Sequence, residues 1–226
     1  MAEEHALVLE EVSKHYAGKT AVNQASFTVP KGVVFGLLGP NGAGKTSLIR
    51  MITRITLPDA GRITFLGQPL REEHQHQMGY MPEERGLYRK MKVAEQLHYL
   101  LRLRNLGKKA AQEAAAEWLE RLGMQDVADK KVEELSKGMQ QKIQFISTIA
   151  HRPPLLILDE PFSGLDPLNA DLMESILAEL QQQGTTILLS THRMEQVEQL
   201  CTHIALISNS RIVLTDEVAN VKQNYK

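Results

Sequence analysis

The sequence "VVFGLLGPNGAGKT", residues 33–46, joins an apolar run to a glycine-rich turn that fills every fixed position of the pattern G-x-x-x-x-G-K-[ST]. The apolar run is typical of a parallel strand buried on both faces, and "KTSLIRMITRI" predicts a helix directly after the turn. Glycines let the backbone curl until successive N–H groups point inward at the positive end of that helix. The stretch therefore predicts a phosphate-binding loop rather than an ordinary strand-to-helix turn.

Two side chains of this loop have predicted roles in binding a nucleoside triphosphate with Mg²⁺. The Lys45 ammonium would reach the terminal phosphates, and the Thr46 hydroxyl would ligate Mg²⁺. The rest of the loop and the next residue of the helix are expected to contact the nucleotide: Gly39, Pro40, Asn41, Gly42, Ala43, Gly44 and Ser47.

A second motif, "LLILDEPFSGLD", covers residues 155–166. Its four apolar residues predict a central strand that leaves Asp159 and Glu160 at the carboxyl end, where open α/β sheets bind ligands. Adjacent carboxylates at the end of a buried strand repel each other and are hard to desolvate, so a cation is expected beside them. We expect Asp159 to hold Mg²⁺ through its water shell and Glu160 to polarise an attacking water. A solvated acid pair is the alternative, which the apolar run disfavours.

A third motif, "STH", residues 190–192, follows the apolar run "TILL". A histidine that stands alone is more often structural than functional. His192, however, emerges at the same predicted sheet edge as Asp159 and Glu160. We therefore predict that it donates a hydrogen bond to the terminal phosphate and orients the attacking water.

Composition sets limits on the class of protein. The chain has 226 residues, 42% of them hydrophobic and 23% charged, which suits a globular fold with a sizeable core. A formal net charge of -1 gives no overall basic field for nucleic acid. The single Cys201 excludes an intramolecular disulfide and fits a reducing compartment. Because the longest apolar runs are too short to span a bilayer and no leader pattern is visible, we expect a soluble, cytoplasmic chain without its own membrane anchor.

The chain reads as one α/β domain, residues 1–226, with an inserted helical segment. Strands are expected at "ALVLEEV", "AVNQASFTV", "GRITFLG" and "MGYMPEE", and "RIVLTDE" is expected to form a hairpin with "HIALIS". Helical periodicity begins at Val93 and continues to about Leu122. We place the core and a β subdomain at about 1–83 and 153–226, and an α-helical subdomain at about 84–152.

Two histidine-containing stretches and one basic stretch have weaker functional signals. "HQH", residues 74–76, and the pair Cys201 and His203 have metal-like spacing but lack the further ligands that a closed site needs. Lys108 and Lys109 follow "RLR" without interleaved aromatic residues, so a solvated helix face is favoured over a nucleic-acid patch.

Taken together, these motifs resemble the nucleotide-binding domain of ATP-binding cassette transporters over nearly the whole chain. "GPNGAGKT" matches the Walker A motif, "LLILDE" Walker B, "SGLD" the D-loop and "STH" the switch histidine. "LSKGMQ" resembles the family signature, usually LSGGQ, which other phosphate-loop ATPases lack. "GYMPEERGLYRKM" and "LSKGMQQK" are most similar to bacterial exporters of the sodium-efflux and antibiotic-resistance type.

The resemblance implies a P-loop NTPase core with a mixed, mostly parallel sheet, an N-terminal antiparallel β subdomain and an inserted α-helical subdomain. It also implies that Tyr16 stacks on adenine. Two domains would pack head to tail, so that the signature of one contacts ATP on the Walker A loop of the other. The implied signature residues are Leu135, Ser136, Lys137, Gly138 and Met139, and the implied D-loop residues are Ser163, Gly164, Leu165 and Asp166. A plain helix N-cap remains open for Ser136.

Three residues depart from the family pattern. Lys137 and Met139 replace the usual glycine and glutamine of the signature, which adds a cation and removes an amide donor. Glu83 stands at the glutamine position of the Q-loop, where a carboxylate still reaches Mg²⁺ through water. A solvated turn acid is the alternative for Glu83. The predicted Mg²⁺ residues are thus Thr46, Glu83 and Asp159.

The resemblance implies an ATP hydrolase that powers an exporter as a homodimer or heterodimer at the cytoplasmic face of the inner membrane. Separate permease subunits would hold it there, with a permease helix received in a groove near "RGLYRKM", and no nucleic acid is expected. A soluble cassette ATPase acting on DNA or ribosomes is one alternative. The 114 residues from Lys45 to Asp159 leave no room for its coiled-coil insertion, and the chain is too short for a second cassette. A non-hydrolysing nucleotide sensor is disfavoured by Glu160 and His192. Relatives often carry a further C-terminal segment, and the sequence leaves open whether one was removed.

Overall fold

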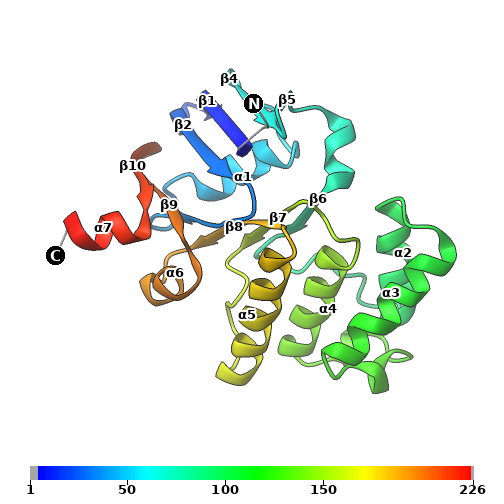
Figure 1. The fold of residues 1–226 in the computed structure, drawn as a ribbon. Helices are drawn as coiled ribbons and strands as arrows, with labels where there is room; N and C mark the ends of the chain where they lie inside the picture. The colour runs from blue at the N-terminus through cyan, green and yellow to red at the C-terminus, as the bar shows by residue number, and fades with distance from the viewer. Residues whose placement is uncertain (1–4, 225–226) are drawn as a thin grey trace.

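The computed structural model describes residues 5–224, so residues 1–4 and 225–226 of the predicted domain lie outside the described part. Two β-sheets and a group of helices make up the fold (Figure 1). The hydrogen-bonded order is β2-β1-β4-β5 in one sheet and β10-β9-β3-β8-β7-β6 in the other. The predicted division into an antiparallel sheet and a mostly parallel sheet is confirmed.

The antiparallel sheet is built from the N-terminal third of the chain. Its strands are β1 (His5–Tyr16), β2 (Lys19–Pro30), β4 (Ala60–Phe65) and β5 (Gln68–Pro69). Inward-facing apolar side chains such as Leu9 and Val29 pack in one cluster with Leu48 of α1 and Phe35 of β3. This packing places the turn between β1 and β2, with Tyr16 and Lys19, beside the loop that precedes α1.

The second sheet carries the ends of the three motifs to one edge. Its parallel strands are β3 (Val34–Leu38), β6 (Met78–Met81), β7 (Leu155–Asp159), β8 (Thr186–Thr191) and β9 (His203–Ser208). Strand β10 (Arg211–Glu217) is antiparallel to β9, as the predicted hairpin requires. Residues of β3, β7 and β8 are all buried, as expected for strands with near-continuous apolar runs. The loops that follow these strands therefore start side by side.

Helices lie on both faces of the parallel sheet: α1 packs in one cluster with the antiparallel sheet, whereas the other helices pack in a second cluster. The helices are α1 (Lys45–Ile52), α2 (Val93–Leu103), α3 (Lys108–Arg121), α4 (Lys137–Ile149), α5 (Pro167–Gln182), α6 (Met194–Leu200) and α7 (Val218–Asn224). Short 3₁₀ helices occupy Glu72–Gln77, Gln125–Val127 and Val132–Glu134. Figure 1 shows α2, α3 and α4 gathered near β6, with α7 at the opposite end beyond β10. None of the helices within residues 5–224 combines the length and apolarity needed to cross a bilayer.

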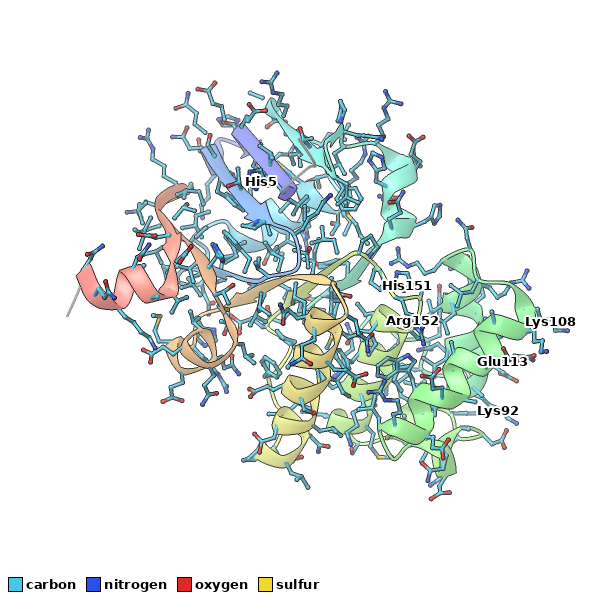
Figure 2. The ribbon with its side chains drawn as sticks, viewed as in Figure 1. His5, Lys92, Lys108, Glu113, His151 and Arg152 are labelled. Carbon is cyan, nitrogen blue, oxygen red and sulfur yellow. The ribbon has the colours of Figure 1, made fainter. Side chains whose placement is uncertain are left out.

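The predicted helical stretch after Val93 divides into two helices. Asn105 adopts a left-handed backbone conformation with φ 65°, and Gly107 is the N-cap of α3. The charged residues at the start of α3 face solvent: Lys108 and Glu113 are exposed (Figure 2), and Lys109 forms an exposed ion pair of 3.7 Å with Glu113. A solvated helix face is what the sequence favoured for these lysines.

Candidate functional site

A cavity of about 410 Å³ opens at the carboxyl edge of the parallel sheet. It gathers residues that lie far apart in the sequence, including Tyr16, residues of the phosphate loop, Glu83 and the carboxylates at the end of β7. Its lining residues are Tyr16, Lys19, Ala21, Asn41, Gly42, Gly44, Lys45, Thr46, Ser47, Glu83, Asp159 and Glu160. The sequence did not single out Lys19 and Ala21, because only the turn after Tyr16 brings the start of β2 back across the loop.

The glycines of the loop are needed for close packing as well as for conformation. Gly44 has φ 117°, and a Cβ built on it would lie 2.3 Å from the carbonyl oxygen of Ala21. At Gly39, with φ 155°, a Cβ would lie 2.2 Å from the carbonyl oxygen of Ile207. Any side chain at either position would clash with backbone, so the path of the loop depends on glycine there.

The Lys45 side chain is buried within its own loop, with 7% of the residue exposed. Its Nζ donates hydrogen bonds of 2.7 Å to the Gly39 carbonyl and 3.3 Å to the Pro40 carbonyl. Both acceptors are neutral oxygens. A phosphate oxygen in the cavity would therefore offer this ammonium a stronger, charge-assisted hydrogen bond.

Thr46 and Asp159 meet in the cavity. The Thr46 hydroxyl donates a hydrogen bond of 3.2 Å to Asp159 Oδ2. Burial is the main cause that raises the pKa of Asp159 above its ordinary value of 3.8, while the hydrogen bond from Thr46 lowers it. A divalent cation at this point would favour the charged carboxylate and so counteract the effect of burial.

The donor set around Thr46 fits Mg²⁺. A hydroxyl and carboxylates are the hard oxygen ligands that Mg²⁺ prefers, and Glu83 lines the same cavity as Asp159. Within residues 5–224, no cluster of three or more His, Cys, Asp or Glu side chains forms a metal cage. Mg²⁺ at nucleotide sites is bound by one or two protein ligands together with phosphates and water, so a sparse donor set is what such a site needs.

Glu160 and His192 form a direct contact next to this cavity. His192 Nδ1 lies 2.7 Å from Glu160 Oε1, and the Glu160 side chain is only 11% exposed. Strands β7 and β8 pair with Asp159 opposite Ser190, and this register places the two residues that follow them within reach. Glu160 also holds an unusual left-handed backbone conformation with φ 49°, of the kind that is often concentrated at functional sites.

Tyr16 lies half-exposed at the end of β1, with 39% of the residue accessible. The Lys14 ammonium lies 5.6 Å from the centre of its ring. An exposed aromatic face at the mouth of the cavity is suited to stacking on a nucleobase.

The signature and D-loop residues do not line the cavity. Ser136 is the N-cap of α4, and its Oγ accepts a 3.2 Å hydrogen bond from the Met139 N–H. A Cβ built on Gly138 would lie 4.0 Å from Leu165 Cδ2, so the signature lies beside the D-loop. Asp166 is the N-cap of α5, and the hydrogen bond from the Asn169 N–H is the main cause that lowers the pKa of Asp166.

The histidines of residues 74–76 lie in a short 3₁₀ helix away from this edge. His74 is buried, and its Nδ1 accepts a hydrogen bond from the Arg71 N–H. Cys201 is buried, and burial raises the pKa of its thiol to about 12. His74 and Cys201 therefore lie in the packed interior of the described chain.

A family model described as ABC transporter matches residues 22–163, which include the phosphate loop, the signature and both carboxylates at the end of β7. The chain belongs to the ABC transporter family. This membership confirms the resemblance that the motifs carried.

Individual members of the ABC transporter family are similar to this chain over more than the segment that the family model matches. The chain is 45% identical to the ABC transporter ATP-binding protein YhaQ of Bacillus subtilis (strain 168) over 97% of this chain and 74% of the relative. It is 40% identical to the Nod factor export ATP-binding protein I of Burkholderia pseudomallei (strain K96243), over 89% of this chain and 67% of that protein.

Solved structures agree with the fold. The ATP binding subunit of an ABC transporter superposes with a TM-score of 0.90 at 27% identity, covering 97% of this chain and 93% of that one. CbiO1 from Clostridium perfringens, part of the ABC transporter complex CbiONQ, gives a TM-score of 0.85 at 25% identity, covering 98% and 92%. The P-loop fold expected from the motifs is thereby confirmed.

Proposed function

We propose that this chain binds and hydrolyses ATP and drives export through separate membrane subunits. The observation that carries the proposal is the cavity lined by Lys45, the Thr46–Asp159 pair and Glu160, whose carboxylate contacts His192. A cation-binding pair, a buried ammonium and a carboxylate held by a histidine are the groups needed to bind a triphosphate and direct water at it.

Binding of Mg·ATP would use the loop and its neighbours. The N–H groups of the loop residues other than Pro40 and the Lys45 ammonium would hold the β- and γ-phosphates, and Tyr16 would stack on adenine. Thr46, Asp159 and Glu83 would hold the metal, the carboxylates acting through water. When bound, Mg²⁺ supplies neutralisation of the charge on the terminal phosphates.

Hydrolysis would depend on Glu160 and His192. The Glu160 carboxylate would accept a hydrogen bond from the attacking water, and its contact with His192 would fix its orientation. A neutral imidazole that donates from Nδ1 has only an acceptor at Nε2. His192 would therefore serve Glu160 and a phosphate together only as the imidazolium.

The assembly proposed for this chain is a head-to-tail dimer, of two identical or two different ATPase subunits. Ser136 and Gly138 lie outside the cavity of their own chain, which supports a role at the nucleotide of a partner. Such a dimer would act at the cytoplasmic face of the membrane, without nucleic acid.

A membrane partner would dock on a groove of about 340 Å³ beside α2 and α4, lined in part by Leu87, Leu100 and Leu103. The family relatives support the partner and the direction of transport: CbiO1 is part of a transporter complex, and the Nod factor protein is named for export.

A single substitution tests hydrolysis. In Glu160→Gln, the cavity keeps its shape and its phosphate-binding groups, so ATP affinity should stay near the wild-type value while turnover falls about 10²-fold or more. Phosphate release and equilibrium ATP binding measure the two quantities. Glu198→Gln, an exposed acid of α6 paired with Lys222, is the matched control and should leave both unchanged. Wild-type turnover in Glu160→Gln would remove Glu160 from the reaction.

A further inference from the structure

The segment that carries Glu83 is a wall shared by two cavities. It leaves β6 at residue 82 and continues to Tyr88, ahead of α2. Glu83 lines the nucleotide cavity, whereas its neighbours Pro82 and Gly86 line the groove of about 340 Å³ beside α4. The position of this segment therefore sets the shape of both cavities at once.

Gln144, on the third turn of α4, forms hydrogen bonds with this segment on either side of Glu83. Gln144 is only 3% exposed. Its Nε2 donates hydrogen bonds of 3.0 Å to the Pro82 carbonyl and 3.3 Å to the Glu84 carbonyl. Both protons of one amide nitrogen are thus used on the two carbonyls that flank Glu83. Because the backbone is held before and after Glu83, the direction of its side chain is restricted.

Two further buried glutamines hold the neighbouring backbone and side chains. Gln141 accepts a hydrogen bond of 3.3 Å from Arg85 Nε, and its own Nε2 donates one of 2.9 Å to the Pro161 carbonyl, next to Glu160. Gln96 of α2 accepts a 2.8 Å hydrogen bond from the Tyr88 N–H. Gln141 and Gln144 belong to the same helix as the N-cap Ser136, so one rigid element meets the Glu83 segment, the loop after Glu160 and the signature.

The surroundings of Gln144 on α4 are otherwise apolar. The residues beside it on α4, Ile143, Phe145 and Ile146, are fully buried and apolar. Gln144 Oε1 is buried without a hydrogen-bond partner in the described chain. An unpaired buried polar atom costs about 1–3 kcal/mol. An apolar residue would avoid that cost, so the carboxamide is better explained by the two carbonyls that it orients.

We propose that Gln144 is the positioning residue for Glu83: its amide aligns the Glu83 carboxylate with the metal site and couples that carboxylate to the signature helix. This inference rests on the proposed binding of Mg·ATP. In a closed dimer, α4 moves as a unit when Ser136 meets the partner's nucleotide, and Gln144 transmits that movement to the metal site of its own chain.

The test compares nucleotide binding with and without metal. The probe is the non-hydrolysable ATP analogue adenylyl imidodiphosphate, titrated calorimetrically with MgCl₂ or with EDTA, and the readout is the ratio of the two Kd values. Gln144→Met keeps the length of the side chain but has no N–H donor. In this variant Mg²⁺ should strengthen binding of the analogue about tenfold less than in the wild type, because a group that orients a metal ligand has been lost. The Kd in EDTA should be unchanged.

A double-substitution cycle separates positioning from general damage. Glu83→Ala should also reduce the tightening by Mg²⁺, and adding Gln144→Met to it should change the ratio no further. Gln140→Met is the matched control, because Gln140 also donates to two backbone carbonyls, those of Val132 and Leu135, from the same helix. It should keep the wild-type ratio. If Gln144→Met does not fold, Gln144→His retains one ring N–H and should give an intermediate ratio.

The outcomes distinguish this inference from the function on which it rests. Normal binding of the analogue with an unchanged ratio in Gln144→Met would overturn the role of Gln144 alone, as would additive effects of the two substitutions. Wild-type protein that binds neither form of the analogue would contradict the proposed function itself.

Discussion

The nucleotide cavity and the signature segment, residues 135–139, use their polar groups in opposite ways. In the cavity, Lys45 and Asp159 are nearly fully buried, at 7% and 3% exposure, and each contacts another group of the site. In the signature, Ser136 and Gly138 stand at the N-terminus of α4, where helix N–H groups and the helix dipole attract anions. The cavity is thus assembled within one chain, whereas the ligand proposed for the signature would have to be brought by another molecule.

This difference predicts which substitutions act inside one chain. Lys45→Ala removes a charge-assisted contact with phosphate, so a dilute monomer should bind ATP about 10- to 100-fold more weakly. Ser136→Arg changes only the signature and should leave monomer affinity at the wild-type value. Equilibrium titration at protein concentrations below dimerisation measures both. A comparable loss in Ser136→Arg would place the signature at its own chain's nucleotide and break the comparison.

Mixing the two variants tests the other half of the comparison. Each variant alone should be inactive, because every site of its homodimer lacks one contributor. In a mixed dimer, one site has both defects and the other pairs an intact Lys45 with an intact Ser136. About half of the dimers are mixed and each has one working site of two, so phosphate release should return to about a quarter of wild-type turnover if sites act independently.

If coupling between the sites keeps the mixture inactive, cross-linking tests whether the signature faces the partner's phosphate loop. Chains with Ser136→Cys and chains with Asn41→Cys, joined by a short bifunctional linker with ATP, should give a covalent dimer. Asn41 is preferred to its neighbour Gly42, whose φ of 78° is unfavourable for cysteine. The native Cys201 is buried, with its pKa raised to about 12, and should not compete. A chain that carries both substitutions and cross-links only to itself would exclude the trans arrangement.

The same contrast explains what could be predicted from sequence. The cavity residues follow strands with near-continuous apolar runs, and parallel strands end at one edge, so the convergence of Lys45, Asp159, Glu160 and His192 followed from pattern. Gln144 gave no signal, because its partners are backbone carbonyls some sixty positions earlier, whose location depends on tertiary packing. The trans role proposed for Ser136 rests on family resemblance, and in one chain the same residue forms an ordinary N-cap.

The smallest expected effect separates these two roles of Ser136. Its hydroxyl caps α4 by accepting from the Met139 N–H, so Ser136→Ala should cost about 1 kcal/mol of stability, whereas Ser136→Gly should cost only a few tenths, since glycine is tolerated at N-caps. Both substitutions remove the oxygen that would face the partner's phosphate. If the signature acts in trans, turnover at saturating ATP should therefore fall equally in the two variants, although thermal unfolding distinguishes them. Asp166→Ala and Asp166→Gly change the N-cap of α5 in the same way and provide the comparison for the effect of capping on stability. If turnover instead follows stability, high in Ser136→Gly and low in Ser136→Ala, then Ser136 serves α4 alone, and the contrast between the two regions reduces to a cavity beside a capped helix.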